Sequence, residues 1–444
     1  MSKTLERRNS SKSFSHTPSN TIDLTDKDAP SYIEIESDEE DDYKKVTGLI
    51  SQNKFEEAIK LLTGTLDSRI KRLGSDHLEV GQCHYTLGNV YLQCQNFEEA
   101  ISQLKKAIPI LKKKLGKKDI NLFNAYFDLA KAYLACSATE DLHYILQKAQ
   151  KVGKKAVGED NPKMAEVHYM LGQAYLASKD YEESEKSLEK ALRLFIKNYG
   201  INDFKVAETY ELLGSVYSIR EKCPASINAF KKALRIYTDR IDKFDSRMAK
   251  IHYKLAVSYI DTEAYFSAIK SLESTLAILE NQYPGIHKRK AEIYRLLGSC
   301  YFHKGDYSEM KAMCNIAIDM YKQLEGNYAR HISLIYFDMG AAATNQNNFK
   351  EALYHYLEGI KLCQSVKASA HDLENLCNFL TLSSAIFEDH YNWENALAYT
   401  KKYIMIKRKL LKASQRNTQP SITTLSELEQ LEVLRGNNII QDVY

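Results

Sequence analysis

The sequence predicts an all-α protein in which helix pairs stack into an elongated solenoid. The main observation is a 42-residue period. A large aliphatic residue followed by Gly or Ala recurs seven times without insertion or deletion, at Leu87-Gly88, Leu129-Ala130, Leu171-Gly172, Leu213-Gly214, Leu255-Ala256, Leu297-Gly298 and Met339-Gly340. A fixed period in this range is typical of arrays in which each repeat is one supersecondary unit stacked on its neighbours. Such an array has no single deep core, and its long curved surface is the best clue to function.

Each repeat is predicted to be an antiparallel pair of helices. In the first half, apolar and small residues follow helical spacing, as in Ala165, Tyr169, Gly172 and Leu176. Three residues after the Gly or Ala column, six repeats carry a tyrosine: Tyr91, Tyr133, Tyr175, Tyr217, Tyr259 and Tyr301. The second half adds columns of aromatic and small residues, and short polar turns such as residues 177–180 join the two halves. Small residues allow two helices to approach closely, and aromatic side chains fill the space beside them.

These columns resemble the tetratricopeptide repeat over about residues 43–412. The resemblance implies a right-handed superhelix of about eight or nine helix-turn-helix repeats. The usual repeat has 34 residues, so the longer period adds up to about one turn to each helix. Long repeats of this kind, and loops such as residues 73–77 and 157–162, are similar to the kinesin light chain and nephrocystin subclass. The paired Asn of kinesin light chain repeats is absent, because those places read Tyr85-Thr86 and Phe127-Asp128.

The segments that flank the array differ from it in composition. Residues 1–22 carry a net charge of +3, whereas residues 23–42 hold ten acidic residues and one lysine. We expect residues 1–42 to form a disordered arm, because they are rich in charge and poor in apolar residues. Residues 413–444 are predicted to be a linker followed by a helix that caps the last repeat, with leucines on one face.

Composition excludes several classes of protein. No stretch approaches 18 consecutive apolar residues, and the polar start lacks the apolar core of a signal peptide. We therefore expect no membrane insertion and a cytoplasmic location. Association with the cytoskeleton or a cilium is an alternative. The eight cysteines include no Cys-x-x-Cys, which argues against disulfide and zinc sites. A net charge of +9 over residues 43–444 is too small for a nucleic-acid-binding stripe.

A ladder of aromatic residues is the first candidate binding site. In the family that the chain resembles, the first helix of each repeat lines the concave face. Its groove positions lie three residues before the Gly column, and one and four residues after it. The first of these columns reads Tyr43, Tyr85, Phe127, Tyr169, Glu211, Tyr253, Arg295 and Phe337; Asn89 and Lys131 belong to the second. Exposed Tyr and Phe are common contact residues. The alternative is that the column is buried against the next repeat, which periodicity alone does not distinguish.

Two further columns have competing interpretations. Lys250 and Lys254, one turn apart, form with Arg295 the one basic patch suited to an acidic peptide. The alternative is a surface of ordinary ion pairs along the helices. Histidines His84, His168 and His252 stand in another column, two repeats apart. Because repeats are about 10 Å apart and metal ligands must lie about 2 Å from one ion, we interpret these as packing residues.

The arm contains three short motifs. Residues 21–26 and 32–40 each alternate aliphatic residues before a run of acids, with Ile22 and Leu24 in one motif and Ile33 and Ile35 in the other. Both resemble SUMO-interacting motifs, which add a strand to a sheet edge. Alternatively, residues 32–42 fold back into the basic groove as an internal ligand, or the arm only increases solubility. Ser10 follows two arginines, as in a basophilic-kinase site.

No catalytic motif is present in the sequence: we find no Gly-rich phosphate loop, Gly-x-Ser-x-Gly or His-Glu-x-x-His. The sequence therefore predicts a non-enzymatic scaffold or adaptor without metal or cofactor, which binds protein segments in its concave groove. The alternative is a structural component of a cytoskeletal, motor-associated or ciliary assembly, suggested only by the resemblance to nephrocystin-like repeats. Partner identity does not follow from the fold.

Overall fold

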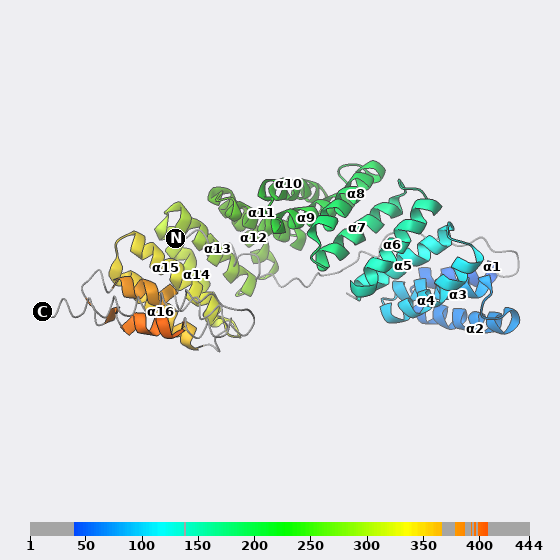
Figure 1. Ribbon diagram of the computed structural model, residues 1–444, viewed down its shortest axis with the longest axis horizontal. Coiled ribbons are helices and arrows are strands. Elements are labelled where there is room, and N and C mark those ends of the chain that lie inside the picture. Colours follow the sequence, from blue (N-terminus) through cyan, green and yellow to red (C-terminus); the bar gives the residue numbers. More distant parts are fainter. Residues whose placement is uncertain are drawn as a thin grey trace, which may run out of the picture. The chain divides into compact units, whose positions relative to one another are not determined.

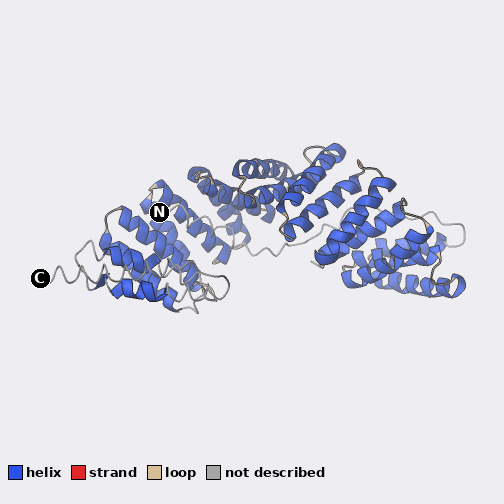
Figure 2. Cartoon of the chain, viewed as in Figure 1, coloured by secondary structure: helices blue, strands red, loops and turns tan. Residues whose placement is uncertain are grey.

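The computed structural model describes residues 40–136, 139–365, 378–386, 392, 395–396 and 398–406. Helices joined by short loops make up this part of the chain (Figure 2). The predictions for residues 1–39 and 413–444, which include the arm motifs and the capping helix, lie outside the described residues. So does the side chain of Tyr43. The prediction of an all-α stack of helix pairs is confirmed.

The chain divides into two compact units, Met1–Ile241 and Asp242–Tyr444, and each is described by itself. In both, an odd-numbered helix and the next even-numbered helix form one repeat (Figure 1). The helices of unit 1 are α1 (Glu40–Ser51), α2 (Phe55–Leu73), α3 (Leu78–Gln93), α4 (Phe97–Lys114), α5 (Ile120–Ala135), α6 (Thr139–Ala156), α7 (Pro162–Ala177), α8 (Tyr181–Tyr199), α9 (Phe204–Ile219) and α10 (Cys223–Arg240). Those of unit 2 are α11 (Ser246–Asp261), α12 (Tyr265–Gln282), α13 (Lys288–Lys304), α14 (Tyr307–Gln323), α15 (Ala329–Asn345) and α16 (Phe349–Ser365).

The period fixes where the first helix of a repeat begins. Asp119, Asn161, Asp203 and Asp245 occupy equivalent places, and the side chain of each accepts a hydrogen bond from the backbone N–H two residues later at 2.7–2.9 Å. Such caps satisfy an amide that has no partner within the helix, and each contributes about 1 kcal/mol.

The loops between repeats of unit 1 share one glycine position. Gly74, Gly116, Gly158 and Gly200 have φ between 84° and 88°, a backbone conformation that residues with a Cβ rarely adopt. The next place in this column is Asp242, the first residue of unit 2. The regular inter-repeat loop therefore stops where the chain divides into its two units.

The glycine of the 42-residue period lies at the crossing of the two helices in a repeat. A Cβ added at Gly88 would come within 2.7 Å of Leu104 on α4, and one added at Gly214 within 2.5 Å of the Phe230 ring on α10. Leu104 is fully buried and Phe230 nearly so. Absence of a side chain at these glycines lets the paired helices pack closely.

The helices form two layers in each unit. Consecutive odd-numbered helices contact each other, α3 with α5, α5 with α7 and α7 with α9 in unit 1, and α13 with α15 in unit 2. Neighbouring repeats of a curved stack approach most closely on the inner side, so the odd-numbered helices form the inner layer.

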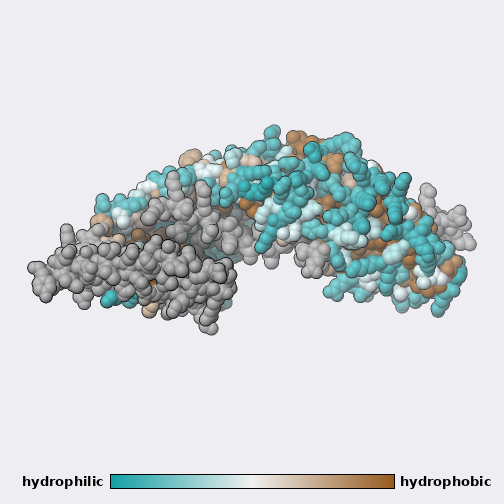
Figure 3. Space-filling model, in the orientation of Figure 1, coloured by the Kyte–Doolittle hydropathy of each residue, from teal (hydrophilic) through white to brown (hydrophobic). Residues whose placement is uncertain are grey.

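The surface is mainly polar on the face shown in Figure 3, where apolar side chains of the described residues appear in separate patches. Phe266, with 75% of its surface exposed, and Ile201, with 60%, are the two most exposed large apolar residues in the described part of the chain. None of the helices in the described part of the chain is long and apolar enough to span a membrane.

Candidate binding surface on the inner helix layer

Four of the sequence-predicted site residues gather around Asp128, on α3 and α5. The Tyr85 hydroxyl donates a hydrogen bond of 3.0 Å to Asp128 Oδ2 in the next repeat, and the Asn89 side chain also hydrogen-bonds Tyr85. Lys131 Nζ lies 4.5 Å from the centroid of the Phe127 ring. Burial raises the pKa of the Asp128 carboxyl, although Lys131 and the Tyr85 hydrogen bond oppose the shift. Sequence reasoning did not assign Asp128 to the site.

Most of the aromatic ladder is buried. Phe127 exposes 2% of its surface, Tyr85 7% and Tyr253 9%, whereas Tyr169 and Phe337 are half-buried. Tyr169 packs edge-on against Phe195, with ring centroids 6.2 Å apart. The ladder therefore joins the core of the repeats and offers little area to a partner.

The neighbouring groove column remains accessible to solvent. Its members, one place after the Gly or Ala column, are all half-buried on the inner layer: Asn89, Lys131, Gln173 and Ser215 in unit 1, and Val257, Ser299 and Ala341 in unit 2. In unit 1 this column is polar. The side-chain oxygen of Gln173 is buried and accepts no hydrogen bond from the described residues. Buried acceptors are nearly always paired, and this oxygen is one of the exceptions among the described side chains.

Charged residues on the inner layer pair from one repeat to the next. Lys163 Nζ donates to Asn124 Oδ1 at 3.0 Å, and Lys205 Nζ lies 2.7 Å from Glu166 Oε1. The cation stands at the second residue of one odd-numbered helix, and its acceptor lies on the preceding odd-numbered helix. The Lys205–Glu166 pair neutralises part of the charge that the sequence places near the groove, whereas the hydrogen bond to Asn124 leaves the charge of Lys163 in place.

The predicted basic patch in unit 2 is partly neutralised as well. Arg295 binds both carboxylate oxygens of Glu292 at 2.8 and 3.3 Å, and Tyr321 donates to Glu292 Oε2 at 2.9 Å. Arg295 and Tyr321 hold the pKa of the Glu292 carboxyl below its usual value despite burial. Lys250 is exposed and Lys254 half-buried. Arg295 is therefore paired with Glu292, and Lys250 is the most exposed of the three cations in the predicted patch.

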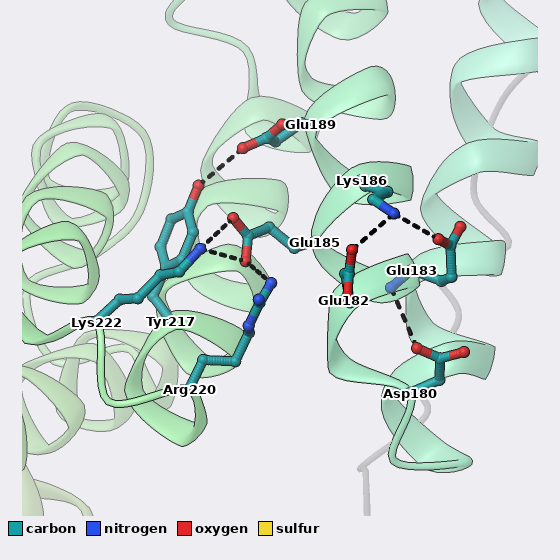
Figure 4. Close-up of polar contacts among 9 residues, drawn as sticks. All are labelled: Asp180, Glu182, Glu183, Glu185, Lys186, Glu189, Tyr217, Arg220 and Lys222. Atoms are coloured by element: carbon teal, nitrogen blue, oxygen red, sulfur yellow. Dashed lines mark hydrogen bonds and ion pairs between the residues drawn. The ribbon is translucent and has the colours of Figure 1, made fainter.

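A second polar cluster lies on α8 and at the turn between α9 and α10 (Figure 4). Glu185 pairs with both Arg220 and Lys222 of the following repeat, with Lys222 Nζ 2.8 Å from Oε1. The Tyr217 hydroxyl donates to Glu189 Oε1 at 3.2 Å. Since Glu185 is only 13% exposed, this cluster joins two repeats. The contact of Tyr217 gives one reason for tyrosine in its column, because the hydroxyl reaches the second helix of the preceding repeat.

The histidine column lies among packed side chains. His84 Nδ1 is 2.7 Å from Gln103 Oε1, and His168 is half-buried. Burial, with Lys190 and Arg193 nearby, lowers the pKa of His168 to about 4. The described residues contain no cluster of three metal-ligating side chains. Candidate motif residues Ile22, Leu24, Ile33 and Ile35, together with Ser10, lie outside the described residues and stay predictions.

Comparison with known proteins identifies the family of the repeats. The sequence profile of the tetratricopeptide repeat matches residues 48–113, 144–196, 163–239 and 289–365, more than half of the chain. The chain belongs to the tetratricopeptide repeat family. Repeats of this family generically form protein-interaction scaffolds. No curated protein sequence matches this chain.

Several solved structures are similar to this chain at low sequence identity. The apo form of RapI is 14% identical with a TM-score of 0.51, covering 82% of this chain and 99% of that one. A putative kinesin light chain from Podospora anserina with nearly identical TPR-like repeats is 18% identical with a TM-score of 0.40, covering 47% and 99%. BtubC from P. vanneervenii is 17% identical with a TM-score of 0.42, covering 52% and 92%.

Proposed function

We propose that this tetratricopeptide repeat protein is a non-enzymatic adaptor that binds segments of other proteins along its inner helix layer. The observation that carries the proposal is the column of half-buried polar residues at Asn89, Lys131, Gln173 and Ser215. Amide and hydroxyl groups one repeat apart are suited to hydrogen bonds with the backbone of an extended segment.

The buried ladder has a supporting part in this proposal. Tyr85 and Phe127 pack behind the accessible column; Tyr85, itself hydrogen-bonded to Asp128, restrains Asn89, and the Phe127 ring restrains Lys131. Side chains held in this way lose less conformational entropy when a partner binds. Unit 2 has its own candidate residues, Lys250, Lys254 and Phe337, with Tyr253 and Arg295 packed beside them, and Tyr169 supports the surface of unit 1.

Site-specific photo-crosslinking tests this proposal. A benzophenone amino acid placed at Asn89 or at Ser215 reports on the inner layer, and one at Gln147, exposed on α6, is the control for the outer layer. We expect the same cellular protein to be captured from both inner positions and not from Gln147. Capture from Gln147 alone would assign binding to the outer layer. Retention of the chain on detergent-extracted microtubules or axonemes, without capture at the inner positions, would favour the structural role in a cytoskeletal or ciliary assembly.

A further inference from the structure

Two ion pairs at one edge of unit 1 follow the 42-residue period. Lys113, in the last turn of α4, pairs with Asp76 in the loop between α2 and α3. Lys197 Nζ, in the last turn of α8, lies 2.7 Å from Asp160 Oδ2 in the loop between α6 and α7. The two lysines are two periods apart in the sequence, as are the two aspartates. Each pair therefore joins an inter-repeat loop to the end of the next even-numbered helix.

The repeat between these two pairs carries a lysine at both places. One period after Asp76 the chain has Lys118, in the loop between α4 and α5, and one period after Lys113 it has Lys155, near the end of α6. Both are exposed, and neither forms an ion pair with a carboxylate of the described residues. Like charges at these places repel each other. An external anion between the two amines would replace the carboxylate that the neighbouring repeats supply.

Further lysines surround this position. Asp119, the carboxylate in the same loop as Lys118, already accepts a hydrogen bond from the backbone N–H of Asn121 as the cap of α5. The helix dipole favours cations in the last turn of α4, but it does not account for cations in the loop. We define the basic edge as the following lysines, all exposed and without an ion pair to a described carboxylate: Lys71, Lys112, Lys114, Lys117, Lys118 and Lys155.

Exposed aliphatic side chains lie at the same edge of unit 1. Ile120, the first residue of α5, is 48% exposed, and Ile201, in the loop between α8 and α9, is 60% exposed. The equivalents of Ile201 in the other loops of unit 1 are polar: Ser75, Lys117 and Glu159. Aliphatic residues beside lysines are suited to the boundary between lipid headgroups and acyl chains, whereas single-stranded nucleic acid is bound mainly by aromatic stacking and cations.

We propose that the basic edge binds the surface of an anionic membrane. The anionic group of a lipid lies between Lys118 and Lys155, and the side chains of Ile120 and Ile201 lie among the headgroups. Juxtamembrane lysines attract anionic lipids additively, and the attraction decreases with salt because the Debye length falls from about 10 Å at 0.1 M to about 3 Å at 1 M. This contact uses the loop edge and not the inner layer, so it is independent of the proposed adaptor function.

Cosedimentation of the full chain with vesicles tests the proposal. We expect binding to vesicles of phosphatidylserine and phosphatidylcholine in equal parts, little binding to phosphatidylcholine alone, and a several-fold loss at 1 M salt. The variant Lys112→Gln, Lys114→Gln, Lys117→Gln and Lys118→Gln should bind at least about tenfold more weakly. The matched control removes four exposed lysines of unit 1 that lie outside the basic edge and should keep most of the binding: Lys54→Gln, Lys60→Gln, Lys106→Gln and Lys179→Gln.

A single charge reversal separates binding from folding. Lys118→Asp recreates the pair that Asp76 and Lys113 form one repeat earlier, so it should raise the midpoint of urea unfolding while weakening vesicle binding about tenfold. Lys179→Asp makes the same change in an exposed turn at the opposite edge and should leave vesicle binding unchanged. A Lys118→Asp chain that binds vesicles like the parent would contradict the proposed anion site.

The aliphatic residues distinguish a membrane from other polyanions. Ile201→Ser should weaken vesicle binding several-fold, and Ile219→Ser, a similarly exposed isoleucine at the end of α9, should not. If single-stranded DNA binds as tightly as the vesicles and Ile201→Ser changes neither affinity, the basic edge is a general polyanion site and the proposal is wrong. Equal binding to phosphatidylcholine and phosphatidylserine vesicles, or binding to neither, would also overturn it.

Discussion

Lys205 on α9 and Glu166 on α7 form an ion pair of 2.7 Å between consecutive repeats. The two side chains are 28% and 19% exposed, so water screens the pair less than it would at the surface. With Lys163 and Asn124, which occupy equivalent places one repeat earlier, the pair shows that the inner layer is joined by polar contacts as well as by apolar packing.

The strength of this pair is our first prediction. A double-mutant cycle of Lys205→Met and Glu166→Gln, measured as the free energy of unfolding in urea, should give a coupling of about 0.5–1 kcal/mol. The matched control is Lys186 with Glu182, an exposed pair at 2.9 Å within α8. Its coupling should stay below about 0.5 kcal/mol. Equal coupling in the two cycles would show that the inter-repeat position confers no advantage.

Two glycine substitutions should change stability in opposite directions. Gly200 has φ 87° and no atom within 4 Å of the place that a Cβ would occupy, so Gly200→Ala should cost about 1–3 kcal/mol through backbone strain alone. Gly64 lies exposed within α2 with equally open space, and Gly64→Ala should stabilise by about 0.5–1 kcal/mol. Thermal unfolding of both variants measures these two changes in stability. A Gly200→Ala protein as stable as the parent would refute the assignment of a positive φ to this loop.

Histidine burial predicts a loss of stability in weak acid. The pKa of His168 is about 4 in the folded chain, below the ordinary value of 6.5, so the unfolded chain binds more protons between these pH values. The stabilisation is complete above pH 6.5 and is lost as the pH falls towards 4, by about 1–3 kcal/mol. His168→Tyr places here the residue that Tyr126 and Tyr210 supply in neighbouring repeats, and it should flatten the pH profile. An unchanged profile in urea titrations would rule out His168 as the cause.

The repeat period was sufficient to predict the helix pairs, and the reasons are local. Each cap, such as Asp119 or Asp203, and each Gly or Ala at a helix crossing, such as Gly214, acts on residues within about 20 positions of it. The packing of the ladder was not predictable in this way. Whether Tyr85 faces solvent depends on how closely the next repeat approaches, and the structure buries it because its hydroxyl reaches Asp128, 43 residues later.

The division of the chain between residues 241 and 242 was not part of the sequence prediction. The 42-residue period continues across this division without a break, from Leu213 to Leu255. The sequence does change at this point in the column of loop glycines. After Gly74, Gly116, Gly158 and Gly200, the next place in the column is Asp242. The contact between Lys205 and Glu166 joins residues 39 positions apart in neighbouring repeats. Such a pair can be recognised only when the stacking of the repeats is known.

The most direct test of the adaptor proposal compares matched substitutions on the two layers of unit 1. Once a partner has been captured, its affinity should be measured by calorimetry for Lys131→Ala with Gln173→Ala on the inner layer, and for Lys190→Ala with Gln147→Ala on the outer layer. Each pair removes one lysine and one glutamine, and circular dichroism should confirm that both variants fold. We predict that the inner pair weakens binding at least about tenfold, or 1.4 kcal/mol, and that the outer pair leaves it unchanged. Unchanged affinity in the inner pair, or an equal loss in the outer pair, would contradict binding at the inner layer.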